Sequence, residues 1–89
     1  MKVRELKNAL SLMVPETQIT KTMTTISHWV KTVHEKTEYS TESEKETAAL
    51  TKFSGLGIVE LSTKGKTLTA KLSKSGKELH SDFVAHGYY

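Results

Sequence analysis

Two short segments that alternate apolar and polar residues place the tightest constraint on how this chain folds. They span residues 57–62 and 67–72. Alternation with a period of two is typical of a strand with one buried face. The apolar members are Val59, Leu61, Leu68, Ala70 and Leu72. Lys64-Gly65 lies between the segments and fits a two-residue hairpin loop.

That loop sets a definite pairing of the two strands. Thr63 would face Lys66, Leu61 would face Leu68, and Val59 would face Ala70. The apolar members then share one face, as a half-buried hairpin requires. We therefore expect a two-stranded hairpin whose tip carries Lys64, Gly65 and Lys66.

Helical periodicity precedes the hairpin. Apolar residues recur at spacings of three and four over residues 2–14, and again from Glu16 to about Glu35. Pro15 separates the two because the residue before a proline is disfavoured in the helical conformation. Trp29 is expected to pack against a neighbouring helix. Threonines crowd the second segment, and since threonine is a poor helix former, we expect its first turns to fray or break.

Capping patterns locate two further helices. Thr41-Glu42-Ser43-Glu44 fits a capping box in which Thr41 caps the helix and Glu44 reaches back. A third helix is expected from Glu42 to Ser54, ended by Gly55 and Gly57. A fourth should begin near Lys74 with Ser73 as its cap. Its inward residues would be Leu79 and Phe83.

Size and composition indicate a single domain spanning residues 1–89. The chain has no cysteine and 36% hydrophobic residues, so we expect an intracellular, cytoplasmic protein without disulfides or a membrane segment. No P-loop, GxSxG or GxGxxG motif is present, which argues against an enzyme and predicts no catalytic residue, no metal site and no cofactor.

Charge is distributed unevenly around a net value of +3. Residues 1–34 and 47–89 are basic, whereas residues 35–46 carry five glutamates against two lysines. Such polarity could orient the molecule on a polyanion.

Two passages in the chain resemble a known family. Leu50-x-x-Phe53-x-x-x-Gly57-Ile58-Val59 resembles the passage from recognition helix to wing in MarR- and PadR-like regulators, and the stretch Leu72–Leu79 resembles the passage that follows their wing. The resemblance implies an α+β, mainly α, winged helix-turn-helix fold with three helices, a two-stranded hairpin wing and a C-terminal helix. It also implies sequence-specific binding of double-stranded DNA by a small transcriptional regulator.

In that fold the third helix would enter the major groove and the wing would lie on the backbone. Hydroxyls can contact base edges or phosphates, and lysines can pair with phosphates. The candidate DNA-binding residues are Lys45, Thr47, Ala48, Thr51, Lys52, Lys64, Gly65, Lys66 and Lys71. Glu44 could accept a hydrogen bond from a base or serve only as a capping partner.

Two alternatives stay open, one for the reading helix and one for the partner. Thr24–His34 could be the reading helix, because its sequence also suits a helix-turn-helix. The domain could instead be a winged helix that contacts another protein, which the acidic opening of the third helix favours. A homodimer through the first helix and Leu79–Tyr89 is also expected, since such regulators commonly read two half-sites. The last two tyrosines could equally form a frayed tail.

Overall fold

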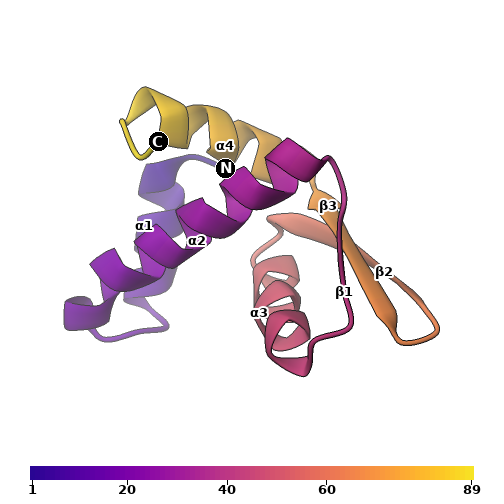
Figure 1. Ribbon diagram of the computed structural model, residues 1–89. Helices are drawn as coiled ribbons and strands as arrows, with labels where there is room; N and C mark the ends of the chain where they lie inside the picture. The colour runs from indigo at the N-terminus through magenta and orange to yellow at the C-terminus, as the bar shows by residue number, and fades with distance from the viewer.

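The computed structural model describes all of residues 1–89, as four helices and a three-stranded antiparallel sheet (Figure 1). The elements in chain order are α1 (Val3–Ser11), α2 (Glu16–Lys36), β1 (Tyr39–Thr41), α3 (Glu44–Gly55), β2 (Val59–Lys64), β3 (Thr67–Leu72) and α4 (Lys74–Ala85). The predicted α+β, mainly helical class is confirmed, with 61% of the residues in helices. The strand count is not, because a third strand precedes α3.

Helix α2 is the longest element, and its apolar stripe faces the centre of the molecule. Its buried residues are Ile19, Met23, Ile26, Ser27, Val30 and Val33. The expected fraying at its start is wrong, because the helix is continuous from Glu16. Several threonine hydroxyls form hydrogen bonds within the helix. Thr24 donates to the Thr20 carbonyl at 3.0 Å and Thr25 to the Lys21 carbonyl at 3.1 Å.

Helix α1 is shorter than predicted and is attached to α4 at its start. The backbone N–H of Val3 donates to Asp82 Oδ2 at 2.7 Å, and the terminal amine of Met1 pairs with Glu78 at 2.7 Å. The helix ends at Ser11, so the following Leu12 and Met13 are 89% and 64% exposed. The apolar spacing over residues 2–14 predicts that Met13 shares the buried stripe, and this prediction is wrong.

The β2–β3 hairpin forms in a register two residues away from the predicted one. Leu61 lies opposite Ala70, and Val59 lies opposite Leu72. The loop is Gly65-Lys66, with Gly65 at φ 63°. A glycine in the first loop position suits a type II′ turn, whereas the predicted loop would have started at a lysine. Left-handed backbone costs a non-glycine residue about 1 kcal/mol, which favours the observed register.

The predicted burial of the hairpin nevertheless holds. A shift of two residues keeps every side chain on its original face. Val59, Leu68, Ala70 and Leu72 are buried and Leu61 is half-buried, while their polar neighbours face outward or lie partly exposed.

Strand β1 was not predicted from the sequence. It pairs antiparallel with β3, opposite the edge that β2 occupies, so the sheet order is β1-β3-β2. Thr37 turns the chain from α2 into β1 with φ 64° and ψ −49°, and the Glu38 N–H donates to the Lys36 carbonyl at 2.6 Å. This is the hydrogen bond of a γ-turn, a strained conformation for a threonine.

The C-terminal residues fold back onto α2. The Tyr89 hydroxyl donates to the Ser27 carbonyl at 2.7 Å, and the ring centroid lies 5.7 Å from Lys31 Nζ. Burial raises the pKa of Tyr89 to about 12. Tyr88 packs on the buried Phe83 with ring centroids 4.8 Å apart. Neither tyrosine is a free tail.

Helix α4 begins where the chain leaves the sheet, as predicted. Ser73 caps it by accepting from the Gly76 N–H at 3.0 Å, and its own hydroxyl donates to the Ile58 carbonyl at 3.0 Å. Gly76 is pressed against the same carbonyl: a Cβ on this residue would lie 2.0 Å from the Ile58 oxygen. The lack of a side chain at Gly76 thus allows α4 to meet the start of β2.

Replacing Gly76 with alanine should therefore destabilise the protein strongly. The Cβ is fixed by its own backbone and would meet a backbone carbonyl, so a rotamer change cannot relieve the clash. We therefore expect a loss of about 3 kcal/mol in unfolding free energy. Gly55→Ala is the matched control. A Cβ there meets nothing within 4 Å, and the variant should gain about 0.5 kcal/mol. Urea denaturation measures both, and equal stability of the two variants would contradict the close approach.

Candidate nucleic-acid interface

Helix α3 is held at both ends by the sheet. It follows β1 and precedes β2, and both of these strands pair with β3. Its buried residues, Leu50 and Phe53, belong to the central apolar cluster. The link from α2 spans residues 37–43 and contains β1, so it is longer than the three- or four-residue turn of a helix-turn-helix motif. The alternative reading segment, Thr24–His34, lies inside the continuous α2.

The start of α3 uses a different cap from the predicted one. Ser43, not Thr41, is the N-cap, and its hydroxyl accepts from the Glu46 N–H at 3.3 Å. Thr41 instead donates to Glu46 Oε1 at 2.6 Å and accepts from the Ser43 N–H at 3.0 Å. Moving the cap by two residues makes Glu46, rather than Glu44, the residue that reaches back. Glu44 is exposed.

Glu46 also connects α3 to an aromatic group beneath it. The Tyr39 hydroxyl donates to Glu46 Oε2 at 3.0 Å, and this hydrogen bond is the main reason that the pKa of Tyr39 is raised. Trp29 packs edge-on against Tyr39 and Phe53, with ring centroids 5.3 and 6.2 Å away. The expectation that Trp29 packs on a neighbouring helix is met through Phe53, with β1 as an unexpected second partner.

The outward side of α3 carries most of the predicted residues. Lys45, Ala48, Thr51 and Lys52 are exposed, and Thr47 is half-buried. The Thr51 hydroxyl donates to the Thr47 carbonyl at 2.7 Å. Its hydrogen is thus used within the helix, so towards a ligand Thr51 offers an acceptor and a methyl group.

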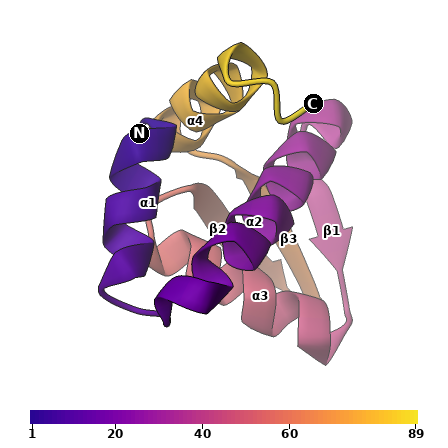
Figure 2. The same ribbon diagram turned by 90° about the vertical axis from the view of Figure 1, so that its left-hand side faces the viewer.

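The hairpin tip is a second exposed basic element. Lys64, Gly65 and Lys66 are all exposed. The tip and the first turn of α3 lie at the same end of the molecule, away from α4 and both chain ends (Figures 1 and 2). Glu42 and Glu44 are exposed at this end too. With Lys45 in the first turn of α3, the surface there combines three exposed lysines with two carboxylates.

Lys71 is separate from this end of the molecule. It is exposed on β3 opposite Glu60 of β2, five residues beyond Lys66 along the chain. A strand advances about 3.3 Å per residue, which puts Lys71 on the order of 15 Å from the tip. It lines a pocket with Lys77 of α4. The structure therefore divides the predicted DNA-binding residues into the α3 face, the tip and Lys71.

The same pocket contains a pair of histidines that was not predicted from the sequence. His34 of α2 and His80 of α4 stack with ring centroids 3.7 Å apart and an interplanar angle of 16°. Their separation in the chain left no local signal; only the packing of α2 on α4 brings them together. His86 instead lies near Asp82, with Nδ1 to Oδ2 at 3.7 Å.

Comparisons of the chain with protein-family models, with curated proteins and with solved structures find no match. Among the helices, none has the length and apolar character required to cross a bilayer. The structure contains no group of three or more histidine, cysteine or acidic side chains placed to hold a metal ion.

Because Glu46 joins α3 to β1, its removal should loosen the candidate interface. Glu46→Ala deletes the acceptor for Tyr39 and Thr41, and we expect a loss of about 1–2 kcal/mol in unfolding free energy. Glu44→Ala removes the same charge from the same turn but no hydrogen bond within the protein, so it should change stability by less than about 0.5 kcal/mol. Thermal denaturation of both variants tests this, and a Glu46→Ala protein as stable as the control would contradict the role given to Glu46.

Proposed function

We propose that this protein binds double-stranded DNA and acts as a small transcriptional regulator of the winged helix-turn-helix type. The observation that carries the proposal is the β2–β3 hairpin, which presents Lys64 and Lys66 at an exposed turn beside the open face of α3. A narrow basic projection next to a helix suits a duplex, since one element can follow the backbone while the other approaches a groove.

The basic side chains are available for such a ligand. No lysine or arginine side chain lies within 4.0 Å of a carboxylate; the ion pairs present involve the terminal amine and His86. Phosphate contacts by these cations would release counterions from the DNA and make the affinity fall steeply with salt. The resemblance of the passages around Leu50 and Leu72 to MarR- and PadR-like regulators adds to this support.

Each part of the interface has a distinct role in the proposal. Lys64, Lys66, Lys45 and Lys52 contact phosphates, with Gly65 allowing close approach of the turn. Thr47, Ala48 and Thr51 face base edges, where the small Ala48 and the Thr51 methyl offer apolar contact with a thymine methyl. Lys71 is too far from the tip to share its phosphate and joins only if the duplex extends along the outer face of the sheet.

The second candidate is a protein-interaction module. Exposed Glu42 and Glu44 lie at the same end as the hairpin tip, and carboxylates there oppose a phosphate backbone but suit a partner of mixed charge. The two candidates differ in salt dependence. Binding to nonspecific duplex that is absent even at low salt would favour the protein partner.

Removing the two tip lysines tests the proposed docking. Lys64→Gln with Lys66→Gln should weaken binding to all duplex sequences alike, and the slope of log affinity against log salt should become shallower by about 1.8 because two phosphate contacts are lost. Lys2→Gln with Lys7→Gln removes the same charge from exposed positions near α1 and should leave the slope within about 0.5 of the parent. Fluorescence anisotropy over a salt series measures both.

Equal slopes for the two double variants would contradict tip docking. Such a result would mean that the binding comes only from a general attraction between a basic protein and a polyanion.

We also propose that the protein forms a homodimer through its terminal helices. Phe83 is fully buried in its own chain, so the exposed apolar side chains are Leu12 and Met13, which directly follow α1, and Val84, Tyr88 and Tyr89 at the end of α4 and beyond it, of which Val84 is 55% exposed. Light scattering should give twice the monomer mass at tens of micromolar protein, and Leu12→Ser with Met13→Ser should shift it towards monomer. A monomer mass for the parent protein would contradict the proposal.

A further inference from the structure

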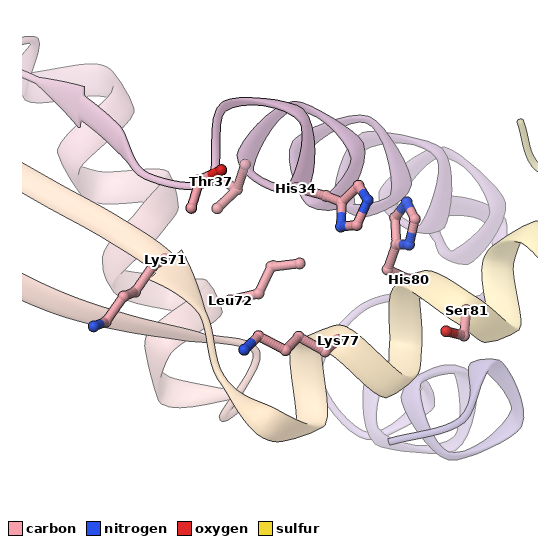
Figure 3. A pocket seen from close by; sticks show the side chains of 8 residues that line it. His34, Thr37, Lys71, Leu72, Lys77, His80 and Ser81 are labelled. Atoms are coloured by element: carbon pink, nitrogen blue, oxygen red, sulfur yellow. The ribbon is translucent and has the colours of Figure 1, made fainter.

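A pocket of about 400 Å³ lies where the end of α2, the end of β3 and α4 meet (Figure 3). Its lining residues are Val33, His34, Thr37, Lys71, Leu72, Lys77, His80 and Ser81. The volume is within the range that accepts small molecules. The pocket is a different surface from the hairpin tip, since of the residues assigned to DNA only Lys71 lines it.

The lining has one sign of charge. Two lysines and two histidines are among the lining residues, and none of the eight is acidic. Figure 3 shows the two imidazoles face to face, with the Lys77 side chain extending from α4 towards β3 and the Lys71 side chain leading away from the histidines. Thr37 and Ser81 add hydroxyl groups at opposite ends. Such a set offers several hydrogen-bond donors and one fixed positive charge, that of Lys77.

The surroundings of His80 disfavour its charged form. Burial, followed by the proximity of His34, lowers the pKa of His80, while Glu35 opposes the shift. The remaining groups near this ring are Lys77 on the same helix and the Tyr89 ring, 5.4 Å away between centroids. A bound anion would favour protonation of His80 and gain a charge-assisted donor.

We propose that this pocket binds a small oxyanion of the phosphate class, either free phosphate or the phosphate group of a small metabolite. Lys77 supplies the fixed positive charge, and the His34–His80 pair with the Thr37 and Ser81 hydroxyls supplies directed donors. The proposal is independent of DNA binding, because none of these residues belongs to the hairpin tip or to α3.

The test is an NMR titration of the protein with inorganic phosphate, and separately with phenyl phosphate, following the imidazole C–H and backbone amide signals. We expect saturable shifts of His34 and His80 with a dissociation constant of about 1 mM, an affinity typical of a small anion held by a few contacts. Sodium chloride at the same ionic strength should not reproduce them. Tighter binding of phenyl phosphate would assign the site to an organic phosphate, and tighter binding of phosphate would assign it to the free ion.

Two matched variants locate the binding. Lys77→Gln removes a lysine that lines the pocket, and Lys74→Gln removes an exposed lysine less than one turn away on the same helix that does not line it. Lys77→Gln should weaken phosphate binding about fivefold or more, and Lys74→Gln by less than twofold. Equal effects of the two variants, or shifts that chloride reproduces, would overturn the proposal. Parent-like amide spectra of both variants would show that the fold is intact.

Discussion

The pairing of β3 on both of its edges is the constraint on which the rest of the structure depends. β3 lies between β1 and β2, and its buried residues Leu68, Ala70 and Leu72 join the apolar cluster formed with the helices. Because β1 leads into α3 and β2 leads out of it, the two contacts of β3 fix both ends of that helix. The continuation of β3 into α4, capped by Ser73, ties the same strand to the three-helix side of the molecule.

Much of this architecture could be predicted because it depends on local chemistry. The period-two alternation specified which hairpin side chains are buried, and the periodic stripe of α2 specified its inner face. The predicted burial of the hairpin is correct although its predicted pairing is not. Sliding one strand by two residues changes every cross-strand partner but leaves each side chain on the same face. The start of α4 at Ser73 could be predicted from the sequence, although only the structure shows that Gly76 meets the Ile58 carbonyl.

The features that the sequence did not reveal depend on contacts between distant segments. β1 has three residues, too few for a periodic pattern, and it becomes a strand because β3 offers an open edge. Ser43 rather than Thr41 caps α3, because Thr41 belongs to β1 and its hydroxyl donates a hydrogen bond to Glu46. The His34–His80 stack follows from helix packing alone. For the candidate interface, exposure of the α3 residues and of the tip was predictable, but the place of Lys71 beside Lys77 at the edge of a pocket was not, since it depends on how α2 and α4 pack against β3.

Two groups of basic side chains lie on surfaces of different shape. At one end the lysines of the hairpin tip project beside α3, which suits an extended polyanion. At the junction of α2, β3 and α4, Lys77 and two histidines line a concavity, which suits a small anion. Because Glu42 and Glu44 are exposed, the end that carries the hairpin tip is not uniformly basic. This mixture of charges gives that end a preferred orientation towards any charged partner.

The proposed function is tested most directly by titrating the isotopically labelled protein with duplex DNA and following every backbone amide at low and at high salt. If DNA binds through this surface, the largest shifts fall on residues 64–67 and on the exposed side of α3 around Lys45 and Lys52, and they disappear at high salt. Shifts centred elsewhere, or an unchanged spectrum at low salt, would contradict DNA binding through this surface.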